Sequence, residues 1–312
     1  SSIYISSSSK KNTYGYGFAE TSHKKNTIFN TVPKNEKQYI RFKLDGLFIE
    51  QNPGKKPKGL AAIFSNSQRG QQLRKWINDI DDFANDESIA GFIIDLGVVS
   101  AGFSKKQEMH DAFMRFKESG KKIIVYAERG ITNTDYYLIS MADEIYINDM
   151  TSVDLRGLAA EVTFYKGMLD TLDIRPEVFR VNIDGKSYKT AGDPFTERTA
   201  TDEMKENYGE LLRDLYTVFV KGIADGRTWT IDQTENIIDN GPYFSTKNSI
   251  EANLITDTMF PDEFESYLED ITDKKEDEDK KKDSYKIIKW SDIDKSKEYV
   301  SDWYTKKKNR IA

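Results

Sequence analysis

The stretch Ile89-Ala-Gly-Phe-Ile-Ile-Asp-Leu96 decides the fold class of this 312-residue chain. Residues 89–94 form a continuous apolar run that ends at Asp95, without the alternation that a half-exposed strand shows. A run of this kind is typical of a strand covered on both faces, as the strands of parallel sheets are. It therefore predicts a buried central strand with helices packed on either side.

The segments on both sides of this strand alternate between strand and helix patterns. Further strands are expected at 39–44, 122–126, 145–147 and 285–290, and helices at 73–83, 109–116, 136–141, 204–219 and just after the capping box of Thr230 and Gln233. Short buried strands that alternate with helices imply parallel pairing with right-handed crossovers. The sequence therefore predicts an α/β fold.

Composition excludes several classes of function. The formal net charge of −6 disfavours nucleic acid as the main partner, because phosphate binding needs a concentrated basic face. The chain has no cysteine, and its two histidines, His23 and His110, stand in polar stretches. Thiolate or histidine metal sites and a Ser-His-Asp triad are therefore not expected, and neither is a cofactor. Hydrolytic chemistry would need a lysine or a carboxylate as its base.

Lys189 is the candidate base. It follows an apolar stretch at 178–181, which predicts a short strand, and lies between Tyr188 and Thr190 beside further small residues. Desolvation there would disfavour the charged form of the lysine and lower its pKa toward neutrality, where the amine can accept a proton. The alternative is a solvated lysine, one of 46 Lys and Arg residues in the chain. Lys186, in a turn-like setting three residues upstream, is a second candidate for the same role.

The ends of the chain are less regular than its middle. We expect a flexible lead-in at 1–36, a folded unit at 37–272, a charged linker at 273–284 and a connector at 285–312. The charged run could also serve as a docking tail. The start without Met suggests that upstream residues were removed, a membrane anchor or export signal among the candidates. No run of 18 apolar residues is present.

Five motifs, taken in their order and spacing, resemble one protein family over residues 37–270. They lie at 89–102, 119–126, 136–143, 178–195 and 243–257. Together they resemble the amino-terminal half of the long, two-repeat form of the bacterial signal peptide peptidase A family. The resemblance implies crotonase/ClpP-like repeats of strands and helices with a short carboxyl-terminal extension, and a serine protease with a Ser/Lys dyad.

The resemblance also implies how that dyad is divided. In the long form the general-base lysine lies in the amino-terminal repeat, in a Tyr-Lys-Ser/Thr-Ala setting that matches residues 188–191. The nucleophilic serine lies in the carboxyl-terminal repeat, which is expected beyond Ala312. At the equivalent position of this repeat stands Asn133, whose amide cannot act as a nucleophile, while Thr132 and Thr134 are either nucleophiles or surface-loop residues. This fragment alone is therefore expected to be inactive.

Further expectations rest on the same resemblance. The turn at 98–104 keeps Gly102 but has Ala101 beside it, which suggests a structural relic of an oxyanion hole. Expected partners are hydrophobic peptide substrates, the protein's own carboxyl-terminal repeat and further copies in a homo-oligomer. The expected location is the bacterial cell envelope, associated with the inner membrane and facing the periplasm or outer side, with the anchor absent from this chain. The alternative is a non-catalytic crotonase-like module for peptide binding or oligomerisation.

Overall fold

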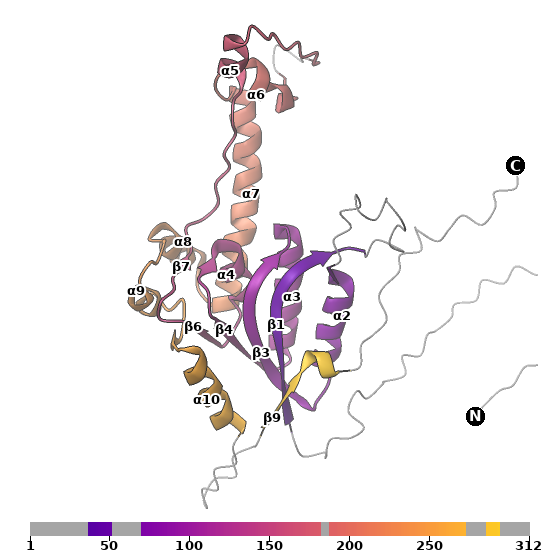
Figure 1. Cartoon of the computed structure of the whole chain (residues 1–312), viewed down its shortest axis with the longest axis vertical. Coiled ribbons are helices and arrows are strands. Elements are labelled where there is room, and N and C mark those ends of the chain that lie inside the picture. The colour runs from indigo at the N-terminus through magenta and orange to yellow at the C-terminus, as the bar shows by residue number, and fades with distance from the viewer. Residues whose placement is uncertain (1–36, 52–69, 182–186, 273–284, 294–312) are drawn as a thin grey trace, which may run out of the picture. The chain divides into compact units, whose positions relative to one another are not determined.

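The computed structural model describes residues 37–51, 70–181, 187–272 and 285–293. Its centre is a seven-stranded sheet with the order β2-β1-β3-β4-β6-β8, in which β9 also pairs with β1 (Figure 1). Every strand pair in this sheet is parallel. The strands are β1 Lys37–Ile49, β2 Gln71–Gln72, β3 Ile89–Ser100, β4 Lys122–Ala127, β6 Glu144–Ile147, β8 Asp257–Thr258 and β9 Tyr285–Lys289. The predicted α/β class is confirmed, and the parallel sheet is consistent with a crotonase/ClpP-like fold.

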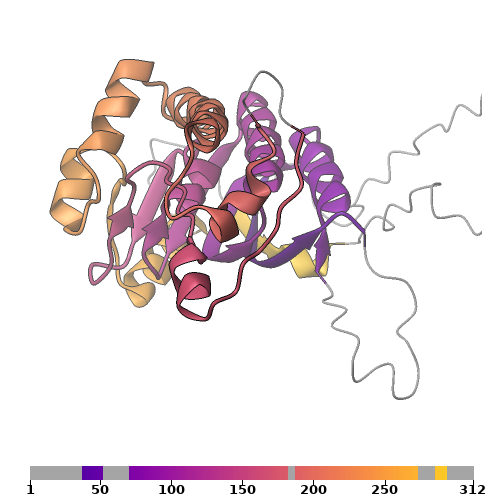
Figure 2. The ribbon, with the colours of Figure 1, turned by 90° about the horizontal axis from the view of Figure 1, so that it is seen from above.

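Helices cover both faces of the sheet (Figure 2). The helices nearest the sheet are α2 Leu73–Ala84, α3 Phe103–Glu118, α4 Asn133–Ile139 and α10 Pro261–Thr272. The remaining elements are β5 Ile131–Thr132, β7 Val153–Asp154, α5 Lys166–Thr171, η1 Thr190–Gly192, α6 Asp193–Thr196, α7 Asp202–Arg227, α8 Ile231–Asp239, α9 Thr246–Glu251 and η2 Trp290–Asp292. All the helices and strands predicted between residues 39 and 147 are present, and so are those predicted at 204–219, after residue 230 and at 285–290.

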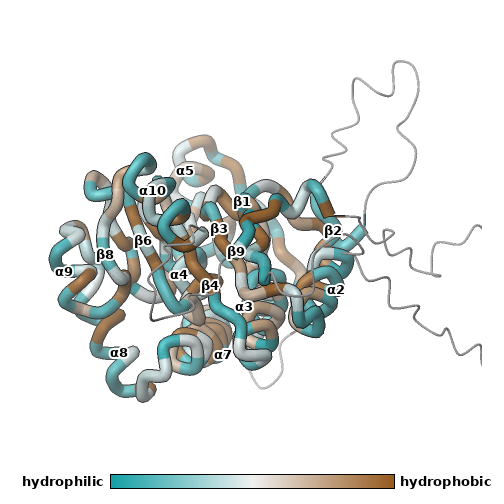
Figure 3. Tube along the Cα trace, turned by 90° about the horizontal axis from the view of Figure 1, so that it is seen from below, coloured by the Kyte–Doolittle hydropathy of each residue, from teal (hydrophilic) through white to brown (hydrophobic). Residues whose placement is uncertain are grey.

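The core has two layers, one on each face of β3. Because successive side chains of a strand point to opposite faces, Phe92 and Ile93 enter different layers. Phe92 stacks on Phe116 of α3 with ring centroids 3.7 Å apart. Ile93 belongs to the cluster beneath α10, where Phe264 stacks on Tyr126 at 4.5 Å. Figure 3 shows the hydrophobic segments gathered along the central strands between these helices.

Strand β9 and the turn that follows it belong to this sheet. β9 runs parallel to the first part of β1, with Lys37 opposite Tyr285 and Arg41 opposite Lys289. The indole of Trp290 then packs edge-on against Phe42 and Phe83, at centroid distances of 4.7 and 5.0 Å. The start of the predicted connector at 285–312 therefore completes the sheet edge.

Helix α7 is buried only near its two ends. Met204 in its first turn is buried, and so is one face of the stretch from Phe219 to Gly226. In the second stretch, Gly222 lies against the ring of Tyr137 on α4, and Phe219 stacks on the same ring at 5.9 Å. Residues 205–218 cover no core, so the first half of α7 extends away from the sheet (Figure 1).

The predicted strand at 178–181 is wrong. These residues are not part of any sheet in the described chain, and the side chains of Val178, Phe179 and Val181 are 39%, 91% and 77% exposed. Apolar residues form a strand only where another strand supplies hydrogen-bond partners, and none of the described strands reaches this segment. The predicted lead-in at 1–36, the charged linker at 273–284 and the part of the connector beyond Ile293 lie outside the described residues.

Candidate functional site

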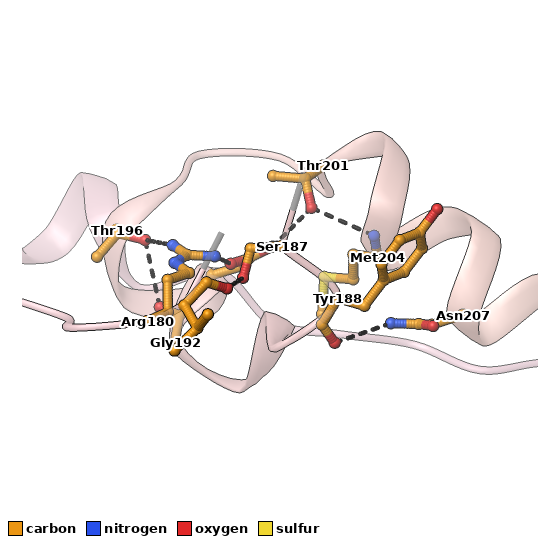
Figure 4. A network of polar contacts seen from close by, with 10 residues as sticks. Arg180, Ser187, Tyr188, Gly192, Thr196, Thr201, Met204 and Asn207 are labelled. Atoms are coloured by element: carbon orange, nitrogen blue, oxygen red, sulfur yellow. Dashed lines mark hydrogen bonds and ion pairs between the residues drawn. The ribbon is translucent and has the colours of Figure 1, made fainter. Parts of the chain in front are cut away.

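Lys189 lies directly before η1 in a segment that is fixed on its amino-terminal side by α7. The Tyr188 hydroxyl donates to Glu206 at 2.8 Å, and the Asn207 amide donates to the Tyr188 carbonyl at 3.2 Å (Figure 4). The side chain of Lys189 itself is exposed in this chain. The desolvation expected from its small neighbours is therefore not supplied by residues described in the structure.

On the carboxyl-terminal side of Lys189, the same segment is fixed by a buried carboxylate. Asp193 has no exposed surface, forms an ion pair with Arg180 and accepts a hydrogen bond from the Thr201 hydroxyl at 2.6 Å. Thr201 is also the N-cap of α7, because its hydroxyl accepts from the Met204 amide at 3.3 Å. Figure 4 shows Arg180 and Thr196 on one side of this network and Thr201 with Met204 of α7 on the other. The lysine segment is thus held to α7 at both ends.

A small packed unit surrounds this network, and we call residues 165–181 and 187–201 the lysine arm. Its halves are joined by the Tyr165 amide, which donates to the Pro194 carbonyl at 2.7 Å, and by stacking of Tyr165 on Phe195 at 5.6 Å. A salt bridge between Arg198 and Asp170 adds a third link at 2.6 Å. The arm nevertheless exposes many large apolar side chains: Tyr165, Met168, Leu172, Ile174, Val178, Phe179, Val181, Tyr188 and Phe195.

The lysine arm and α4 contact different parts of α7. The arm contacts Glu206 in the first part of α7, whereas α4 contacts Phe219 on the same helix. The 13 residues between these two contacts span about 20 Å at 1.5 Å per residue. The contacts of the lysine arm and of α4 are therefore well separated along α7.

Asn133 is held by main-chain groups of the segment after β7. Its amide nitrogen donates to the Gly157 carbonyl at 2.5 Å, and its amide oxygen accepts from the Arg156 amide at 2.7 Å. Both ends of the side chain are satisfied by the protein itself. Beside it, the Thr132 hydroxyl donates to Asp135 at 2.8 Å. The side chains at the start of α4 are thus held in place by hydrogen bonds within the protein.

A second lysine, Lys106 of α3, approaches α4 and was not identified from the sequence. Its side chain is buried, and its amine donates to the Thr134 hydroxyl at 2.8 Å and to Asp135 at 2.7 Å. The carboxylate balances the buried ammonium charge, so the three groups join α3 to α4 rather than activate a hydroxyl. Nothing in the local sequence marks Lys106, because its partners come from 28 and 29 residues away.

His110 is buried, contrary to the polar setting expected from its neighbours. Its Nε2 lies 3.2 Å from the Ser140 hydroxyl and its Nδ1 3.5 Å from Asp111, which places a serine, a histidine and an aspartate in a row. Ser140 has no exposed surface and donates to the Tyr137 carbonyl at 3.0 Å. The Ser140 hydroxyl thus has acceptors in the main chain of the protein, and its burial keeps it from any substrate in this chain. The row is a packing contact.

The described lysine with a clearly lowered pKa is Lys121. Burial lowers the pKa of Lys121 from 10.5 to about 8, opposed by the charges of Asp86 and Glu87. Its amine donates to the Phe83 and Asp86 carbonyls, both at 2.5 Å, and thereby fixes the loop between α2 and β3. This lysine stabilises a loop next to the sheet and does not belong to the lysine arm.

The turn at 98–104 leads from β3 into α3. Gly102 is the N-cap of α3, and the Ala101 amide donates to the Val99 carbonyl at 3.2 Å. Within the described ranges, no three His, Asp or Glu side chains are grouped to hold a metal ion. In the same ranges, no helix has the length and apolar character needed to span a bilayer. Lys186, the alternative base, lies outside the described residues.

The fold and the site define a parallel α/β protein with an exposed lysine on an arm beyond its sheet. The profile of peptidase family S49 matches residues 115–274, about half of the chain, and includes the lysine arm. The chain therefore belongs to peptidase family S49, which confirms the resemblance to the signal peptide peptidase A family.

Two curated relatives and one solved structure illustrate the similarity. Protease 4 of Haemophilus influenzae is 31% identical over 191 residues, which cover 58% of this chain and 30% of that protein. The chloroplastic serine protease SPPA of Arabidopsis thaliana is 31% identical over 188 residues, covering 60% of this chain and 27% of that protein. The chain thus spans less than a third of these relatives. A crystal structure of a Plasmodium falciparum peptidase aligns with a TM-score of 0.38 and 9% identity over 70% of this chain and 95% of that one.

Proposed function

We propose that this chain is the amino-terminal repeat of a serine peptidase and that Lys189 is its general base. The observation that carries the proposal is the position of Lys189. It lies within the residues matched to family S49, in a segment held at both ends, and about 20 Å along α7 from the α4 contact. A lysine base in this position needs a hydroxyl from another part of the protein, and we assign that hydroxyl to a serine in a second repeat.

The arm's exposed apolar surface supports the same proposal. A lysine accepts a proton at neutral pH only when its amine is removed from water. Apolar side chains on both sides of Lys189 in the chain, such as Phe179 and Phe195, are 91% and 45% exposed. Packing of a second repeat or another copy against this surface would remove water from the amine and from these side chains together.

The chemistry of such a dyad follows from the residue types. The amine of Lys189 takes the proton of the serine hydroxyl as the serine oxygen bonds to the carbonyl carbon of the scissile peptide. The resulting ammonium returns that proton to the leaving amine as the carbon–nitrogen bond breaks. Water then attacks the acyl-serine with the same lysine as base, which releases the carboxylic acid and restores the serine hydroxyl.

The proposed substrates are cleaved signal peptides, which are hydrophobic and extended. We further propose that the assembled peptidase is a homo-oligomer associated with the inner membrane of the bacterial cell envelope. The apolar side chains of the lysine arm support a role in assembly, since monomeric proteins seldom expose large contiguous apolar surfaces. Extended peptides can add to a protein through backbone pairing, with pockets selecting side chains.

The test uses the natural full-length protein and a serine-directed fluorophosphonate probe. Lys189→Met should lower peptide cleavage and probe labelling by about 10²- to 10⁴-fold, because this is the range that a positioned general base contributes to the rate. Lys205→Met is the matched control, since Lys205 is an exposed lysine on α7 whose amine pairs with Asp202. Lys186→Met tests the alternative candidate for the general base, and it should leave cleavage unchanged if Lys189 is the base. Undiminished cleavage by the Lys189→Met protein would exclude Lys189 as the base.

A non-catalytic role in peptide binding or oligomerisation is the second candidate. It is favoured by Asn133, which holds the Arg156–Gly157 backbone where a nucleophile would stand. The absence of labelling in both the wild-type and the Lys189→Met full-length proteins would support it. The 312-residue chain alone should not cleave peptides under either proposal.

A further inference from the structure

We propose that Asp193 and Thr201 are positioning residues for Lys189. This inference rests on the proposed function and names the groups that set the place of the lysine relative to the sheet. The carboxylate of Asp193 joins Arg180, nine residues before Lys189 in the chain, to Thr201, which begins α7. Lys189 therefore lies between Arg180 and Thr201 in the chain, and both of these residues contact the buried carboxylate of Asp193.

Burial makes this contact strong. Asp193 has no exposed surface, and the Arg180 guanidinium and the Thr201 hydroxyl bind its two different carboxylate oxygens. A buried carboxylate that loses a partner is strongly unfavourable, so its contacts are kept together or lost together. By comparison, Tyr188 and Glu206 on the other side of Lys189 are exposed, and exposed contacts of this kind contribute little. The Asp193 contacts are thus the firmer of the two attachments.

Thr201 connects this carboxylate to a rigid element. Its hydroxyl donates to Asp193 and accepts from the Met204 amide, so one oxygen both fixes the lysine segment and begins the helix. Further along the same helix, Phe219 and Ile223 are fully buried against the body of the protein. The helix is continuous from Asp202 to Arg227. The path from the core to Lys189 therefore runs through α7, Thr201 and Asp193.

The experiment compares two threonine N-caps in the full-length protein. Thr201→Val keeps the size of the side chain but removes both hydrogen bonds, and Thr201→Ser keeps the hydroxyl. Thr230→Val is the matched control, because Thr230 caps α8 by accepting from the Gln233 amide at 3.1 Å and lies outside the lysine arm. Thr201→Val should lower thermal stability more than Thr230→Val, since each variant removes one cap but only Thr201→Val also removes a partner of the buried Asp193 carboxylate.

The expected result is a difference in kcat. Thr201→Val should lower kcat for peptide cleavage by about 10²-fold with KM changed by less than about twofold, because displacement of a catalytic group by about 1 Å costs about that much. Thr201→Ser should retain most of the kcat, and Thr230→Val should leave it unchanged. Wild-type kcat in Thr201→Val would overturn the inference, as would failure of serine to restore kcat.

The Lys189→Met protein distinguishes this inference from the proposed function on which it rests. If Lys189→Met abolishes cleavage and Thr201→Val does not, the lysine is the base and its position does not depend on Thr201. If Lys189→Met cleaves normally, the proposed function fails, and the positioning role fails with it.

Discussion

Two glycines of α7 should respond in opposite directions to the same substitution. Gly222 lies in the buried part of the helix, where a Cβ atom would stand 2.3 Å from Cε2 of Tyr137. Gly209 lies in the extended first half, where a Cβ would meet nothing within 4 Å. Both positions are interior to the helix, so alanine gains the same helix propensity at each, about 1 kcal/mol relative to glycine.

The difference between the two variants comes from the contact with Tyr137. The Tyr137 ring is only 2% exposed, so it has no room to move away from a new methyl group. Overpacking of this kind costs about 1–3 kcal/mol or more, which outweighs the gain in propensity. We expect Gly222→Ala to lower the free energy of unfolding by about 1–2 kcal/mol and Gly209→Ala to raise it by up to about 1 kcal/mol.

Urea unfolding followed by far-UV circular dichroism measures both effects. The two variants should shift the midpoint to opposite sides of the wild type with little change in slope, because the surface exposed on unfolding is the same. If Gly222→Ala is as stable as Gly209→Ala, then α7 does not pack closely on α4. In that case the distance between the lysine arm and α4 would not be fixed by α7.

Two further predictions concern the other parts of the sheet. Trp290→Ala should lower the free energy of unfolding by about 2–3 kcal/mol in thermal or urea unfolding, because the half-buried indole loses its ring contacts with Phe42 and Phe83. Lys289→Ala, which changes an exposed neighbour, should alter the free energy of unfolding little. Equal effects of the two substitutions would place Trp290 outside the cooperative unit. Burial lowers the pKa of Lys121 from 10.5 to about 8, so between these pH values the unfolded chain binds more protons than the folded one. The free energy of unfolding should therefore increase as the pH rises through that window. This increase should be absent in the Lys121→Met protein. An identical pH dependence in both proteins would contradict the assignment.

Elements with a clear apolar period could be predicted from the sequence. The run at 89–94 predicted β3 because a strand buried on both faces must be apolar throughout, whichever neighbours it has. The boundaries were less accurate, since β3 continues to Ser100 and α3 begins at Phe103 rather than near Met109. The residues added to α3 are mostly polar, and tertiary contacts such as that of buried Lys106 with α4 hold them in the helix.

The failures depend on partners that are distant in the sequence. The apolar stretch at 178–181 has the composition of a strand but lacks a neighbouring strand, so it remains extended and exposed. His110 has polar neighbours in the chain but is buried, because the ring of Tyr137 on α4 stacks on it and Ser140 lies against its Nε2. For the candidate site, the sequence indicated Lys189 through its matching neighbours. The attachment of its segment to α7 through Asp193 and Thr201 required the structure.

The continuous helix between the sheet and the lysine arm restricts how the length of the chain can change. Each residue added to or removed from the exposed part of α7 turns the arm by about 100° and moves it by about 1.5 Å. A single deletion between Tyr208 and Asp214 would thus point Lys189 away from its present direction without disturbing any contact inside the arm. Seven residues, close to two full turns, would restore the direction but displace the arm by about 10 Å. Length and angular phase are therefore coupled in α7, and no small insertion or deletion preserves both.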